Sequence, residues 1–105
     1  MLIQLNTDDN IVGNEALAQQ VEIVLTKTLA RFTQHITRLE VHLSDVNSEA
    51  KQGAEDMRCL LEARLVGRQP TAVSHQAATL EQALNGAADK LKNSLESTLG
   101  RLHQQ

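Results

Sequence analysis

Hydrophobic and polar positions along the chain follow two periods, one typical of strands and one typical of helices. Residues 2–6 alternate at every second position and end in a polar turn cluster at residues 6–10. From residue 14 to Phe32, apolar side chains recur at spacings of three and four, which predicts an amphipathic helix. Asn14 is its predicted N-cap, because its side chain can accept a hydrogen bond from a free backbone N–H of the first turn.

The middle of the chain changes to a period of two, which predicts a sheet with one covered face and one face exposed to solvent. The predicted strands span residues 36–44, 57–65 and 71–78, separated by a polar loop over 45–55 and a turn over 67–70. A second helix follows Thr79, which forms a capping-box pattern with Gln82, and its apolar stripe continues to the C-terminus. Gly86 and Gly100 weaken this helix by about 1 kcal/mol each relative to Ala.

The order of these elements, β-α-β-β-β-α, allows few arrangements. A strand–helix–strand connection within one sheet is a right-handed crossover, which makes the first two strands parallel, whereas the next two connections are hairpins. Both helices then cover one face of a four-stranded mixed sheet. We therefore predict an α+β fold, a two-layer sandwich that forms a single domain over residues 1–105.

Composition limits the chemistry that this domain can perform. Apolar residues make up 41% of the chain and Phe32 is the only aromatic residue, so base stacking cannot be a major source of affinity for single-stranded nucleic acid. Cys59 is the only cysteine, which excludes an internal disulfide and fits a reducing compartment. The N-terminus lacks the features of a signal peptide, and no apolar run approaches the ~20 residues of a membrane span. We expect a soluble, cytoplasmic protein.

The net charge of −3 argues weakly against a generic nucleic-acid binder. The whole excess lies in residues 45–56, where four acidic side chains accompany Lys51 alone. The remainder of the chain balances nine acidic against nine basic groups (13 − 4 and 10 − 1). The charge balance therefore says little about partners.

No catalytic or metal-binding motif is present. The four histidines are His35, His42, His75 and His103. None has another histidine, a cysteine or a carboxylate at the ligand spacing of a helix face or hairpin. Cys59 alternates with apolar neighbours and is expected in the core. We predict no enzyme, no metal and no cofactor; a small enzyme would need His75 with Cys59, or His42 with a carboxylate, to converge in a pocket.

Two sets of basic side chains remain as candidates for binding. The helix set comprises Lys27 and Arg31 on the first helix and Lys90, Lys92 and Arg101 on the second. Lys27 and Arg31 share a helix face by their spacing of four; for the whole set, solvation and RNA binding are equally open. The sheet set comprises Arg38, Arg58 and Arg64, interleaved with Glu40 and Glu62. For the sheet set we favour a solvated face with cross-strand ion pairs.

Several segments of the chain resemble a known family. They are Ile3-Gln4-Leu5-Asn6, Asn14-Glu15-Ala16-Leu17, Gln69-Pro70-Thr71-Ala72-Val73-Ser74-His75, Thr79-Leu80-Glu81-Gln82-Ala83-Leu84 and Ala88-Asp89-Lys90-Leu91. With a helix that ends at Phe32 and a strand that begins at Ile36, they resemble the ribosome hibernation-promoting factors. This family is also called the ribosome-associated inhibitor A or sigma-54 modulation family. The resemblance covers nearly the whole chain and rests on a pattern rather than on one motif.

The resemblance implies a protein of the short type that binds the small ribosomal subunit in the channel between head and body. There it would occupy the space of transfer RNA and messenger RNA and so inhibit translation. The helix set would contact ribosomal RNA backbone, reading shape rather than sequence. We expect no DNA or membrane partner, and we favour a monomer.

The chain also departs from the family pattern. Members usually carry basic residues at the positions of Ala18 and Val24, and in the final turns of the last helix. The residues found in those turns here are Asn93, Glu96, Ser97 and Leu99. Fewer phosphate contacts predict weaker RNA binding. The alternative is a protein-interaction module that has lost affinity for ribosomal RNA, with Leu99 and Leu102 packed against a partner or a second copy.

Overall fold

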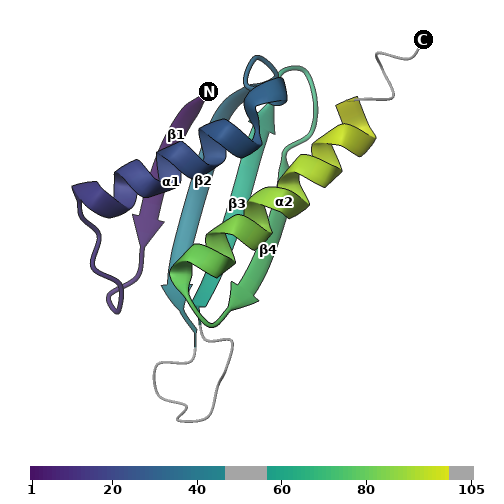
Figure 1. Ribbon diagram of the computed structural model, residues 1–105. Coiled ribbons are helices and arrows are strands. Elements are labelled where there is room, and N and C mark those ends of the chain that lie inside the picture. Colours follow the sequence, from purple (N-terminus) through teal and green to yellow (C-terminus); the bar gives the residue numbers. More distant parts are fainter. Residues whose placement is uncertain (47–56, 100–105) are drawn as a thin grey trace.

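A computed structural model describes residues 1–46 and 57–99, which form a four-stranded sheet with two helices on one face (Figure 1). The elements in chain order are β1 (Leu2–Thr7), α1 (Glu15–Thr28), the 3-10 helix η1 (Ala30–Phe32), β2 (Ile36–Asp45), β3 (Met57–Leu65), β4 (Thr71–Ala77) and α2 (Leu80–Leu99). Strands β1 and β2 are parallel, and the pairs β2–β3 and β3–β4 are antiparallel. The predicted α+β sandwich is confirmed. Most of the predicted 45–55 loop, Gly100, Arg101, Leu102 and His103 lie outside the described residues.

The core forms between the sheet and the helices because apolar residues at every second strand position face the apolar stripes of both helices. On β2 and β3 the buried side chains include Leu39, Val41, Cys59 and Leu61, each fully shielded from solvent. Both helices contribute buried residues to one cluster with these strands. Phe32, 5% exposed, is the only Phe, Tyr or Trp of the chain and also belongs to this cluster.

Both predicted helix caps are confirmed. The backbone N–H of Leu17 donates to Asn14 Oδ1 at 2.9 Å, and the N–H of Gln82 donates to Thr79 Oγ1 at 3.1 Å. Each cap satisfies a donor that the first turn of a helix leaves free, and a cap of this kind stabilises a protein by about 1 kcal/mol.

The first helix is shorter than predicted. Leu29 has φ −102° and ψ 19°, outside the α-helical region, and ends α1 by donating its N–H to Leu25 C=O at 2.9 Å. The N–H of Phe32 then donates to Leu29 C=O at 2.8 Å, which forms the tighter turn η1 and directs the ring of Phe32 into the core. Arg31 therefore lies on η1 and does not share a face of α1 with Lys27.

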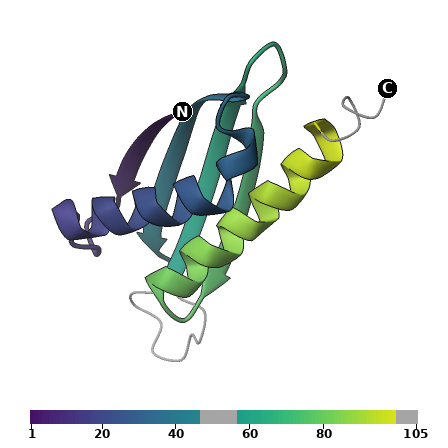
Figure 2. The ribbon, with the colours of Figure 1, turned by 45° about the horizontal axis from the view of Figure 1, so that its top comes forward.

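The two helices approach each other at the C-terminal end of α1 and separate toward their N-terminal ends (Figure 2). Under α2, the ring of His75 on β4 takes the space that a Cβ atom on Gly86 would occupy. The face of β4 that carries His75 is therefore the covered one. Neither α1 nor α2, within residues 1–46 and 57–99, has both the length and the hydropathy of a membrane-spanning helix.

Candidate nucleic-acid interface

The two basic residues of the first helical segment have different surroundings. Lys27 is exposed in the last turn of α1, beside a hollow of about 510 Å³ that Glu22 and Ile23 also line. Arg31 lies on η1 with its side chain 71% exposed, and its guanidinium carbon lies 5.4 Å from the centre of the Phe32 ring. Among the described residues Lys27 has no ion-pair partner, whereas Arg31 has one.

The partner of Arg31 is Glu96 of α2. Arg31 Nη1 donates to Glu96 Oε2 at 3.0 Å, which joins η1 to the penultimate turn of α2. A guanidinium and a carboxylate form a charge-assisted hydrogen bond, but exposed pairs of this kind stabilise proteins by only about 0.5 kcal/mol. Glu96 therefore neutralises Arg31 locally without holding it firmly, and an RNA phosphate would have to compete with this carboxylate.

The lysines of α2 lie on opposite flanks of the helix. Lys90 Nζ donates to the backbone C=O of Ser74 at 2.9 Å, which places Lys90 on the flank above β4. Lys92, two positions later and so about 200° around the helix, shares the other flank with Glu96, one turn further on. That flank faces η1, because Glu96 contacts Arg31. Arg101, the fifth predicted residue, lies outside the described residues.

The structure therefore divides the predicted helix set. Arg31 and Lys92 lie on the side where η1 meets α2, with Glu96 on the same flank, whereas Lys90 lies across α2 and Lys27 is exposed in the last turn of α1. Within the described part of the chain, Lys27 and Lys92 have no hydrogen-bond or ion-pair partner, so their charges are available to an anion. Sequence reasoning missed Glu96 as a partner of Arg31 because 65 positions separate them.

On the uncovered sheet face the charged residues pair differently from the prediction. The register places Arg38 opposite Arg64 and Glu40 opposite Glu62, so like charges face each other across β2 and β3. Arg38 Nε instead lies 3.7 Å from Glu40 Oε2 on the same strand, and Arg38 also donates to the side chain of Gln4 on β1. No ion pair joins Arg58 or Arg64 to any residue in the ranges 1–46 and 57–99. The prediction of cross-strand pairs for these arginines was wrong.

A histidine with nearby carboxylates occurs on this face, contrary to the sequence analysis. His42 Nε2 lies 3.0 Å from Glu62 Oε1, and one ligand atom each from Glu40, His42 and Glu62 lie within 4.8 Å of one another. Glu40 and His42 are two positions apart on β2, but Glu62 lies on β3, so only the folded sheet brings the three residues together. Of the described residues only these three could hold a metal, but Arg38 beside Glu40 places a positive charge next to them.

Cys59 is unsuited to nucleophilic chemistry. It lies directly across β3 and β4 from His75, so the two residues do come together on the covered face. Burial raises the pKa of the Cys59 thiol from 9.0 to about 12, so the thiol stays protonated at neutral pH. The expectation that Cys59 is a core residue is confirmed.

Comparison with known proteins identifies the family. The profile of the family described as "Sigma 54 modulation protein / S30EA ribosomal protein" matches residues 6–103. The chain belongs to this family. It is therefore a ribosome-associated protein of the hibernation and modulation type, and the family resemblance inferred from the sequence is confirmed.

Solved structures support the fold of this family. The Protein Y N-terminal domain of Thermus thermophilus is 22% identical, with a TM-score of 0.73, over 93% of this chain and 99% of that one. A ribosomal subunit interface protein from Coxiella burnetii is 14% identical, with a TM-score of 0.69, over 95% of this chain and 99% of that one. A comparison with curated proteins gave no significant match.

Proposed function

We propose that this chain binds the small ribosomal subunit as a single domain and inhibits translation by occupying space that transfer RNA and messenger RNA would use. The match of the family profile over residues 6–103 carries this proposal. It requires no catalytic group: a folded domain that fills a binding channel competes with the normal occupants by volume alone.

The helix set provides the RNA contacts in this proposal: Lys27, Arg31, Lys90, Lys92 and Arg101. Phosphate contacts supply affinity that does not depend on sequence and that falls as salt rises. Lys27 and Lys92 contribute most, because neither has a hydrogen-bond or ion-pair partner among the described residues. Arg31 must first break its ion pair with Glu96, and Lys90 its hydrogen bond to the Ser74 carbonyl. The free energy of these contacts therefore reduces the affinity that each residue adds.

The alternative function is a protein-interaction module without RNA affinity, in which Leu99 and Leu102 would pack against a partner. Leu99 does not support it. Leu99 is 4% exposed and belongs to the core cluster, so it cannot pack against a partner as predicted. Leu102 lies outside the described residues. We therefore keep RNA binding as the proposed function.

Cosedimentation with purified small subunits across a salt series tests this proposal. Lys27→Ala/Lys92→Ala should weaken binding and lower the slope of log K against log salt by about two, because two phosphate contacts are lost. Arg58→Ala/Arg64→Ala removes the same charge from the uncovered sheet face and should leave binding unchanged. Equal losses for the two double variants, or no cosedimentation of the wild-type chain at low salt, would contradict the proposal.

A further inference from the structure

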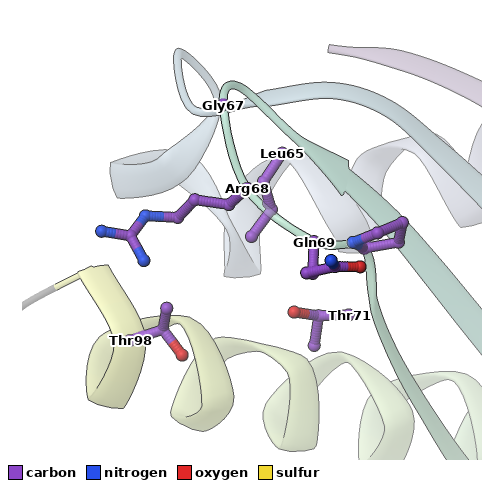
Figure 3. Close-up of a pocket in the computed structure, with 7 residues that line it drawn as sticks. Leu65, Gly67, Arg68, Gln69, Thr71 and Thr98 are labelled. Atoms are coloured by element: carbon purple, nitrogen blue, oxygen red, sulfur yellow. The ribbon is translucent and has the colours of Figure 1, made fainter.

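A hollow larger than the ones beside α1 and near Gly13 lies outside the helix set, where the β3–β4 turn meets the last turn of α2. Its volume is about 940 Å³. The turn contributes Arg68 and Gln69, β4 contributes its first residue, Thr71, and Thr98 projects from α2 on the opposite side (Figure 3). Leu65 forms part of its apolar floor.

The turn that carries Arg68 is built to hold one conformation. Gly67 has φ +68°, in the left-handed region that glycine adopts without steric cost, and Pro70 restricts φ just before β4 begins. The N–H of Val66 donates to His35 C=O at 3.0 Å, which ties the start of the turn to the segment between η1 and β2. Arg68 thus projects from a turn whose backbone conformation is restricted at both ends.

The charge of this hollow distinguishes it from the other two. Arg68 is its only ionisable lining residue, is exposed and has no hydrogen-bond or ion-pair partner within the described ranges. The hollow beside α1 is lined by one basic and one acidic residue, Lys27 and Glu22, and the hollow near Gly13 is lined by Glu15. Of these three hollows, only the one at the β3–β4 turn has a net positive lining, so it favours an anion.

The donors around Arg68 indicate the class of anion. The guanidinium can bind a phosphate through two N–H groups, while the amide of Gln69 and the hydroxyls of Thr71 and Thr98 suit sugar hydroxyls and phosphate oxygens. A volume of 940 Å³ is large enough for a nucleotide unit. No aromatic side chain lines the hollow, so the contact would be with the sugar–phosphate backbone and not with a stacked base.

We propose that the hollow at the β3–β4 turn is a second RNA-backbone site, in which Arg68 binds a phosphate and Gln69, Thr71 and Thr98 face the adjoining ribose. Its identification with RNA depends on the proposed function. The site extends the helix surface around α2: Glu96 holds Arg31 on one flank, and Thr98, two positions later, lies on the other. An RNA strand that crosses the last turns of α2 meets both arginines.

Arg68→Ala tests this site, with Arg64→Ala as the matched control from the uncovered face of β3. Arg68→Ala should weaken binding to small subunits about tenfold and lower the salt slope by about one, because a charged contact to phosphate is lost. Arg64→Ala should change binding less than twofold. Wild-type affinity in Arg68→Ala, in a preparation where Lys27→Ala/Lys92→Ala binds weakly, overturns the second site and leaves the proposed function intact.

A direct titration separates the two proposals further. We expect a uridine trinucleotide added to the ¹⁵N-labelled chain to shift the backbone amide signals of residues 67–69, 71 and 98, and uridine monophosphate to do so only at higher concentration. Shifts confined to other residues would overturn the site, whether or not ribosomes bind. Equal potency of the monophosphate would make free nucleotide the ligand and would overturn the assignment to RNA.

Discussion

Replacing Glu96 by glutamine should strengthen binding to the small subunit, because the change releases Arg31 for phosphate. The pair joins side chains that are 71% and 38% exposed, and exposed pairs stabilise a protein by about 0.5 kcal/mol. A carboxylate about 7 Å from a phosphate in water adds about 0.6 kcal/mol of repulsion. Removing both the ion pair with Arg31 and the repulsion of the phosphate predicts a Kd about sixfold lower, since 1.4 kcal/mol is a factor of ten.

Sedimentation with small subunits at one fixed salt concentration measures this change, and a double-mutant cycle assigns it to Arg31. In an Arg31→Ala chain, Glu96→Gln should lower Kd only about threefold, because only the repulsion term remains. Asp89→Asn removes the same charge from the exposed side of α2 and, as a control, should lower Kd by no more than this threefold. An unchanged or higher Kd for Glu96→Gln, with normal thermal unfolding, would refute the contact between Arg31 and RNA.

Three further predictions concern stability and reactivity. Gly86→Ala should lower the free energy of unfolding by about 1 kcal/mol in urea titrations, because overlap with the His75 ring outweighs the helix propensity of Ala; adding His75→Ala should make the change stabilising. Cys59 should react with a thiol reagent at pH 8 only after denaturation, because it is buried in the folded chain. The free energy of unfolding should fall as the pH rises from about 9 toward 12, because in this range the thiol loses its proton in the unfolded chain but keeps it in the folded one. Asn14→Ala should cost about 1 kcal/mol of stability and leave ribosome binding within twofold of wild type, since Asn14 caps α1 and is distant from the basic residues.

Local patterns in the sequence predicted most of the fold. Alternation on β2 and β3 identified the buried set correctly, because every second residue of a strand faces the same side. Asn14 and Thr79 marked the starts of the helices, because a cap is formed by residues three positions apart. The end of α1 was missed because Leu29 and Phe32 are three positions apart, a spacing that suits both an α-helix and a 3-10 turn.

The candidate site was less predictable, because its contacts join distant parts of the chain. The charges of Arg31 and Lys90 could be read from the sequence, but their partners Glu96 and Ser74 could not. Arg68 was not predicted as a binding residue, because a single basic residue in a turn forms no motif. Only the folded chain places it opposite Thr98. Strand parity fixes which face a residue occupies, whereas register decides which charges meet.

A cryo-electron microscopy reconstruction of the small subunit with this chain would show whether the face formed by the two helices is the face that contacts ribosomal RNA. We expect Lys27, Arg31 and Lys92 within reach of phosphates, Arg68 beside the same RNA surface, and the uncovered sheet face turned away. Density that places the uncovered sheet face, with Arg58 and Arg64, against RNA would contradict this expectation.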